Sequence, residues 1–165
     1  MERQQILLAK SLEAARIPLS VSTFDDRLIL QKTVYLLQAA GIQLGYRFRW
    51  YLKGPYSPDM TANAFGIVNE GESGVAELKG WKLDEPSAQI AQRLQPLLHL
   101  AGGSASDQAR RLELLASALF LFKTRQAKPT DPAGTAAILQ KNGKNFEADE
   151  VAKAVAEMRT YALLA

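Results

Sequence analysis

Apolar and polar side chains alternate along residues 46–53, and this is the clearest pattern in the chain. The apolar positions hold Tyr46, Phe48, Trp50 and Leu52, and the positions between and after them hold Arg47, Arg49, Tyr51 and Lys53. A period of two sends alternate side chains to opposite faces of a β-strand. The pattern therefore predicts a strand with a buried, mostly aromatic face and a solvent-facing face that carries three positive charges.

The strand is expected to stop at a rigid turn. Gly54 precedes Pro55, and a residue before proline is restricted toward extended geometry. Ser57 and Pro58 then read as an N-cap residue followed by a proline in the first helical position. The turn is thus predicted to lead directly into a helix that runs to about residue 69.

Apolar periodicity and capping residues predict that most of the remaining chain is helical. The expected helices cover residues 3–16, 24–40, 58–69, 86–100, 107–125, 132–142 and a last segment after Asn145. The expected N-caps of four of them are Thr23, Ser106, Asp131 and Asn145. Leucine-rich residues 28–37 cover more than one helical face, so the helix over 24–40 is predicted to be the central buried one.

Residues 70–83 are predicted to contain a turn and a second pair of strands. Residues 70–74 are expected to form the turn, and residues 75–78 and 81–83 a hairpin around Lys79 and Gly80. The predicted class is therefore mainly α with a small antiparallel β-sheet (α+β), a helical bundle with a strand and a hairpin. The order helix, strand, helix, hairpin over residues 24–84 also admits a winged-helix-like arrangement.

Composition limits the classes of function. A chain of 165 residues that is 47% hydrophobic is expected to form a single domain, 1–165, with a real core. It contains no cysteine, no apolar run long enough to span a membrane and no signal-peptide pattern, so a cytoplasmic location is expected. A net charge of +3 is too small to imply nucleic-acid binding by itself.

The usual catalytic signatures are missing from the sequence. The single histidine, His99, lies between leucines in a helical segment, which favours a structural or surface role. Ser57 is explained by capping and lies outside any G-x-S-x-G motif. One histidine without cysteine disfavours a transition-metal site, so no catalytic residue, metal or cofactor is expected.

Carboxylates are the remaining candidates for acid–base chemistry. Three adjacent pairs occur, Asp25-Asp26, Asp84-Glu85 and Asp149-Glu150. Each lies at or near an expected helix start, where the helix dipole favours negative charge. An enzyme that uses carboxylates is therefore the least favoured class of function.

The charged face of the predicted strand is the candidate interaction site. Its residues are Arg47, Arg49, Tyr51 and Lys53, together with Tyr56 from the following turn. The simplest reading is a solvated strand face kept soluble by charge. The functional reading is contact with an anion or nucleic acid, with the tyrosines available for stacking. Lys32, in a leucine-rich helix, is expected either to extend its charge to solvent or to pair with a buried carboxylate.

Two segments together carry a family resemblance. Leu30-Gln31-Lys32 with Tyr35-Leu36-Leu37, followed by Tyr51 and then Gly54-Pro55-Tyr56-Ser57-Pro58, resembles the YwgA-like prokaryotic proteins. Residues 112–117 and the closing segment 146–164 extend the likeness over most of the chain. The YwgA-like proteins are similar in turn to the SocA-like, or Panacea-domain, antitoxins. The Panacea pattern usually has tryptophan and an aliphatic residue where this chain has Tyr51 and Tyr56.

The resemblance implies a non-enzymatic regulatory or interaction module that binds a protein partner, as an antitoxin does. The alternative is a nucleic-acid-binding regulator of the winged-helix type. Neither hypothesis involves a membrane or a cofactor.

Overall fold

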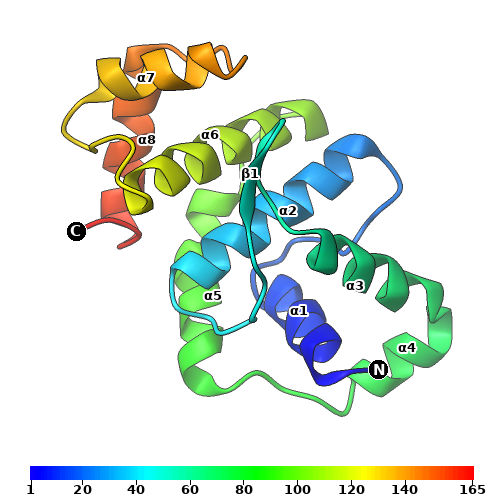
Figure 1. Ribbon diagram of the computed structural model, residues 1–165. Helices are drawn as coiled ribbons and strands as arrows, with labels where there is room; N and C mark the ends of the chain where they lie inside the picture. The colour runs from blue at the N-terminus through cyan, green and yellow to red at the C-terminus, as the bar shows by residue number, and fades with distance from the viewer.

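Eight helices and one short β-hairpin make up the computed structural model, which describes residues 1–165 (Figure 1). The helices are α1 (Arg3–Ala14), α2 (Phe24–Ala39), α3 (Pro58–Asn69), α4 (Gly71–Leu78), α5 (Glu85–Leu98), α6 (Ala105–Lys123), α7 (Pro132–Lys141) and α8 (Ala148–Thr160). The strands β1 (Arg49–Tyr51) and β2 (Gly54–Tyr56) form a two-stranded antiparallel sheet. The predicted class, mainly α with a small antiparallel sheet, is confirmed.

Helices α2 and α6 form the centre of the fold. Every residue of α2 from Leu30 to Leu37 is buried, and so is nearly every residue of α6 from Leu112 to Phe122. These two helices pack on each other more extensively than any other pair. A helix that is apolar around most of its circumference must be surrounded on all sides, which explains the central place of α2. The prediction that this helix is the buried one is confirmed.

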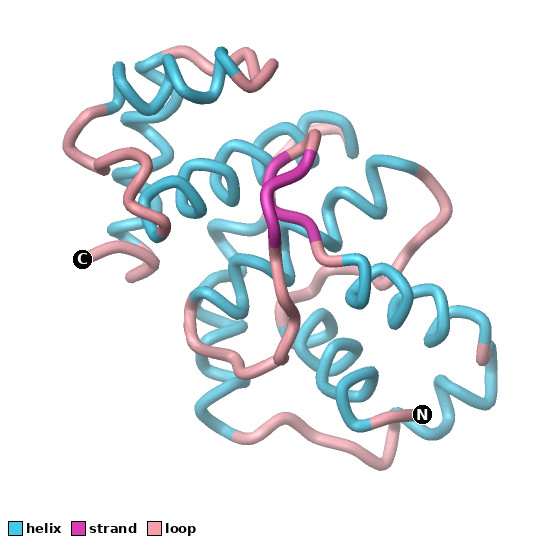
Figure 2. Tube along the Cα trace, viewed as in Figure 1, coloured by secondary structure: helices cyan, strands magenta, loops and turns pink.

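The hairpin lies across α2 and α6 and leads directly into α3 (Figure 2). Figure 1 shows α7 and α8 together at one end of the molecule, where they pack on each other and on α6. One continuous hydrophobic cluster includes buried side chains from all helices except α4. None of the helices combines the length and the apolar character needed to cross a membrane.

Most predicted helix starts are correct because a capping side chain fixes them. The Thr23 hydroxyl accepts a hydrogen bond from Asp26 N, and the Ser57 hydroxyl accepts one from Met60 N. Asp131 caps α7 in the same way. Two predicted caps are wrong, however. Ser104 caps α6 in place of Ser106, and Glu147 forms the capping box of α8 in place of Asn145. In both cases a carboxylate in the N3 position, Asp107 or Glu150, completes the cap.

The predicted turn at 70–74 and hairpin over 75–83 are wrong. Residues 71–78 form helix α4, and residues 81–83 have no regular structure. Gly71, at φ +58°, lets the chain leave α3 and re-enter a helix with no intervening loop. Residues 75–78 (Val-Ala-Glu-Leu) include three good helix formers, so local propensity favours the helix. A winged-helix arrangement that depends on a hairpin at these residues is therefore excluded.

Candidate functional site

The β-hairpin is built from two three-residue strands joined by Leu52 and Lys53. Its pairs are Arg49 with Tyr56, Trp50 with Pro55, and Tyr51 with Gly54. The turn therefore precedes Gly54-Pro55, and the prediction that these two residues form the turn is wrong. They belong to β2, where proline is tolerated at a position that donates no hydrogen bond to the ladder.

The two faces of β1 are assigned correctly by the alternation. Arg47 and Arg49 are exposed, whereas Phe48 and Trp50 pack partly buried against the core. The Phe48 ring lies edge-on to Tyr35 with centroids 5.2 Å apart, and Trp50 lies 5.6 Å from Phe120. Leu52, which the alternation places on the buried face, is instead 76% exposed because it sits at the hairpin tip.

A buried lysine of α2 donates a hydrogen bond to the backbone of β2. The Lys32 side chain is fully buried, and its ammonium donates a hydrogen bond of 2.6 Å to the Pro55 carbonyl. Burial lowers the pKa of Lys32 from 10.5 to about 7, although the nearby Glu113 carboxylate acts in the opposite direction and Lys144 adds to the lowering. Lys32 thus neither reaches solvent nor forms a direct ion pair, the two roles expected for it. It serves as a donor to the hairpin backbone.

A second buried lysine holds the hairpin tip. Lys144, in the segment between α7 and α8, donates a hydrogen bond of 2.6 Å to the Leu52 carbonyl and lies 5.2 Å from the centroid of the Trp50 ring. The Glu113 carboxylate of α6 lies 3.6 Å from the same ammonium. Burial lowers the pKa of Lys144, and Glu113 opposes that shift. The tip is thereby tied to the C-terminal part of the chain.

The two ends of β2 are fixed by different helices, the C-terminal end by α2 and the N-terminal end by α6. The Gln31 side chain accepts a hydrogen bond from Ser57 N and donates to Ser57 O, at 2.9 and 2.8 Å. Gly54, at φ +92°, packs so closely on Ser117 that a Cβ would collide with the Ser117 hydroxyl. That hydroxyl is buried and has no hydrogen-bond partner. The site therefore requires glycine both for its backbone conformation and for its lack of a side chain.

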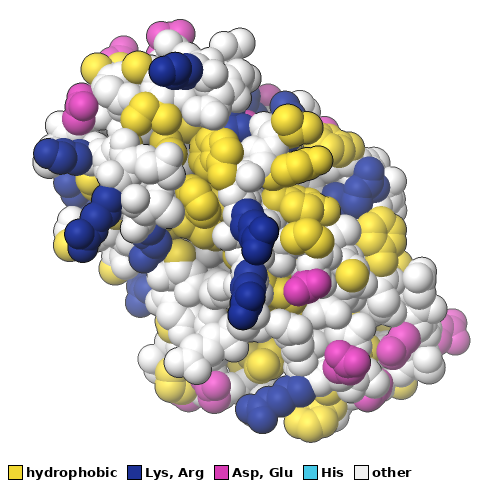
Figure 3. Space-filling model, viewed as in Figure 1, with side chains coloured by type: hydrophobic (Ala, Val, Ile, Leu, Met, Phe, Trp, Pro, Cys, Tyr) yellow, Lys and Arg dark blue, Asp and Glu magenta, His cyan; other side chains and the backbone are white.

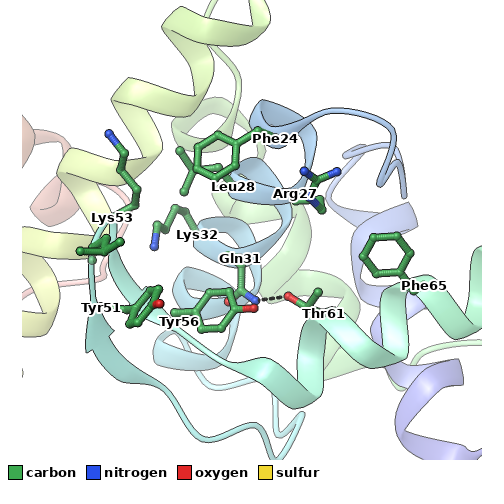
Figure 4. A pocket seen from close by; sticks show the side chains of 12 residues that line it. Phe24, Arg27, Leu28, Gln31, Lys32, Tyr51, Lys53, Tyr56, Thr61 and Phe65 are labelled. Atoms are coloured by element: carbon green, nitrogen blue, oxygen red, sulfur yellow. Dashed lines mark hydrogen bonds between the residues drawn. The ribbon is translucent and has the colours of Figure 1, made fainter.

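A pocket of about 340 Å³ opens between the hairpin, α2 and α3 (Figure 4). Its walls include Phe24 and Leu28 of α2, Tyr51 and Tyr56 of the hairpin, and Phe65 of α3. The two tyrosine rings lie together with centroids 5.5 Å apart. The pocket is within the size range of sites that bind small molecules or single protein side chains. Its floor includes Gln31 and Lys32, so the residues that hold the hairpin also shape the pocket.

The charge around the pocket has one sign. Arg27, Lys32 and Lys53 line it, and no aspartate or glutamate does. Figure 3 shows hydrophobic side chains gathered on this face beside Lys and Arg side chains, with few acidic groups among them. The arrangement suits a ligand or partner that combines apolar surface with negative charge.

Three of the five predicted interaction residues line the pocket and two do not. Tyr51, Lys53 and Tyr56 form one wall. Arg49, at the start of β1, and Arg47, just before the strand, lie outside the pocket. Sequence reasoning missed Phe24 and Phe65.

The other candidate chemical groups do not gather at this site. The His99 ring lies 3.0 Å from the Ala15 carbonyl, at the far end of α5. The three carboxylate pairs lie in or next to the first turns of α2, α5 and α8, as predicted. No group of three or more His, Asp or Glu side chains is placed to share a metal ion.

Comparison with known proteins identifies no matching family model, and neither a curated protein nor a solved structure matches the chain.

Proposed function

We propose that this protein is a non-enzymatic interaction module that binds a protein partner in the cytoplasm. The binding surface is the hairpin tip and the adjoining pocket, hereafter the hairpin surface: Phe24, Arg27, Tyr51, Leu52, Lys53, Tyr56 and Phe65. The observation that carries the proposal is the exposure of large apolar side chains around one pocket. Phe24 is 58% exposed, Tyr51 60%, Leu52 76% and Phe65 38%. Contiguous exposed apolar surface of this kind marks binding sites in soluble proteins.

The rigidity of the hairpin supports this proposal. Two different segments fix its backbone: α2, through Lys32 and through Gln31 at the following Ser57, and the segment between α7 and α8, through Lys144. Side chains displayed on a fixed backbone lose little conformational entropy when a partner binds. Aromatic residues held in this way are typical of binding hot spots.

The partner is expected to present apolar side chains next to carboxylates. Arg27 and Lys53 on the hairpin surface form no ion pair within the chain. Acidic groups on a partner would both steer its approach and fix its register. The resemblance to the SocA-like antitoxins suggests a toxin-like protein, which the module would neutralise by covering its surface.

The test is site-specific photo-crosslinking in the native host. A photoreactive residue at Leu52 should capture a discrete protein, and the same residue at Ala137 should not. Ala137 is an exposed residue of α7 that does not belong to the hairpin surface. Capture at both positions, or at neither, would contradict the proposal.

The variant Leu52→Asp measures how much Leu52 contributes to the binding free energy. Because Leu52 is largely exposed, the melting temperature should change little, whereas the affinity for the captured protein should fall by about 2 kcal/mol or more. Calorimetry of the purified pair measures the affinity, and Ala137→Asp serves as the matched control.

Nucleic-acid binding is the second candidate, favoured by one observation. Arg47, Arg49 and Lys53 are all exposed along the same hairpin, and none has a carboxylate partner. If they contact phosphates, replacing all three by alanine should flatten the salt dependence of duplex binding. The slope of the logarithm of the binding constant against the logarithm of the salt concentration should decrease in magnitude by about 0.9 for each lost phosphate contact. An absence of binding to duplex and single-stranded DNA at low salt would eliminate this candidate.

A further inference from the structure

The two edges of the hairpin differ, because only one of them is covered. Strand β2 contacts both α2 and α6, whereas the principal neighbour of β1 is β2. β1 is thus the outer strand. A strand edge without a neighbour presents backbone donors and acceptors that another strand can use.

The pairing register shows which backbone groups point outward. Residues of an antiparallel pair alternate between hydrogen-bonded and non-hydrogen-bonded positions. Pro55 has no N–H, so the pair Trp50–Pro55 occupies a non-hydrogen-bonded position. The N–H and C=O of Trp50 therefore point away from β2. Phe48 directly precedes β1, and extended backbone at that residue places its N–H and C=O on the same side.

The outward-facing backbone groups at Pro55 and Ser57 already form hydrogen bonds with side chains of α2. The Pro55 carbonyl accepts a hydrogen bond from Lys32, and Gln31 pairs with both the N–H and the C=O of Ser57. The outer edge of β2 is closed by α2. A new strand cannot add there.

The outward groups of β1 have no partner within the chain. No hydrogen bond from a side chain or from another segment reaches the backbone of Phe48 or Trp50. A backbone N–H or C=O must bond to something, so these groups bond to water in the free protein and are available to a partner.

We infer that the partner binds by adding an extended segment to the outer edge of β1, pairing with the backbone of Phe48 and Trp50. The inference rests on the proposed function and specifies how the partner is held. The added segment alternates acidic and apolar residues. Strand addition of this kind obtains affinity from backbone hydrogen bonds and specificity from alternate side chains.

The alternation of the partner follows from the two faces of β1. Side chains of adjacent strands lie beside each other on the same face. One face carries Arg47 and Arg49, which are exposed and unpaired, so the neighbouring positions of the partner suit carboxylates. The other face carries Phe48 and Trp50, both partly exposed at the edge of the core, so the positions beside them suit apolar side chains.

The first experiment measures amide hydrogen exchange by NMR, with a capped peptide of alternating glutamate and valine as the probe. In the free protein the Phe48 and Trp50 amides should exchange rapidly, and saturating peptide should slow both by at least about tenfold. Amides that are already protected in the free protein would show that the edge is closed, which overturns the inference.

The second experiment locates the contact on the backbone. N-methylation of alternate residues in the peptide removes every donor on one edge of its strand. Methylation of one alternate set should abolish binding and methylation of the other should leave it intact, because only one edge of the added strand faces β1. Equal effects of the two sets would overturn strand addition.

The third experiment tests charge complementarity in the intact protein. Arg47→Glu combined with Arg49→Glu should weaken binding of the glutamate–valine peptide by about tenfold or more and confer binding of a lysine–valine peptide. Lys82→Glu, an exposed change between α4 and α5, should do neither.

Failure of this inference is distinguishable from failure of the proposed function. If Leu52 captures a protein partner but no peptide protects the Phe48 and Trp50 amides, the partner binds through side chains alone. The proposed function then stands and strand addition does not. If Leu52 captures nothing, the proposed function fails whatever the peptides do.

Discussion

At the scale of single residues, Lys32 is the most unusual side chain. It is a fully buried lysine whose ammonium has one hydrogen-bond acceptor, the Pro55 carbonyl. The charged groups that act on it are Glu113 of α6 and Lys144 of the segment before α8. Because burial outweighs the attraction of Glu113, the folded protein holds the Lys32 proton less tightly than the unfolded chain does.

This difference in proton affinity predicts a pH-dependent stability. The pKa of Lys32 is about 7 in the folded protein and 10.5 in the unfolded chain, so between these values the unfolded chain binds more protons. The free energy of unfolding should therefore rise with pH from about 7 to 10, by at most about 1.4 kcal/mol per unit for this group. Lys32→Met removes the titration, so its stability should lack that rise.

Urea unfolding at a series of pH values measures the effect. The informative quantity is the difference between wild type and Lys32→Met as a function of pH, because loss of the bond to Pro55 only adds a constant. Lys82→Met, an exposed lysine change, should run parallel to wild type. Parallel curves for Lys32→Met as well would show that Lys32 titrates normally.

At the scale of elements, the hairpin depends on a close approach between β2 and α6. Gly54→Ala should destabilise the protein by about 2–4 kcal/mol, since it adds a left-handed alanine and a collision with the Ser117 hydroxyl. Ser117→Ala alone should be neutral or slightly stabilising, because it removes a buried hydroxyl without a partner.

The double variant separates the two causes. Gly54→Ala combined with Ser117→Ala should recover the stability lost through the collision, whereas the loss due to backbone strain at residue 54 should remain. Thermal unfolding of the two single variants and the double variant gives the coupling free energy between the two positions. Strict additivity of the two changes would mean that the Gly54–Ser117 contact has no energetic role.

The helices and strands differ in how well the sequence predicts them. Helices with a capping side chain, such as α2 after Thr23 and α3 after Ser57, were predictable to within a residue or two. The faces of β1 were predictable because a period of two is unambiguous in residues 46–51. Strand β2 was not, because Gly54-Pro55 is typical of a turn. Helix α4 was not, because a four-residue apolar stretch does not distinguish helix from strand.

The candidate site was predictable only where it is local in sequence. Tyr51, Lys53 and Tyr56 were identified because they belong to one short segment. The contacts that hold this segment come from Lys32, Ser117 and Lys144, which are far apart along the chain. No local pattern relates such residues, since the packing of α2 on α6 brings them together.

At the scale of the whole molecule, Lys144 links the binding surface to the C-terminal helices. It donates to the hairpin tip from the segment that joins α7 to α8, and Glu113 of α6 lies beside it. Both side chains are almost fully buried. Removal of one member of such a pair leaves an uncompensated buried charge, which is more damaging than removal of both.

Lys144→Met should therefore destabilise the protein by about 3 kcal/mol or more and speed exchange of the Tyr51 and Gly54 amides, which pair across the hairpin. Lys144→Met with Glu113→Gln should recover much of the stability, because the buried Glu113 charge that lost its Lys144 partner is removed as well. It should not restore slow exchange, because the bond to the Leu52 carbonyl is still missing. Urea unfolding and hydrogen exchange on the same samples separate the two effects. If exchange at the hairpin is unchanged in both variants, the C-terminal helices do not hold the binding surface in place, and the hairpin depends on α2 and α6 alone.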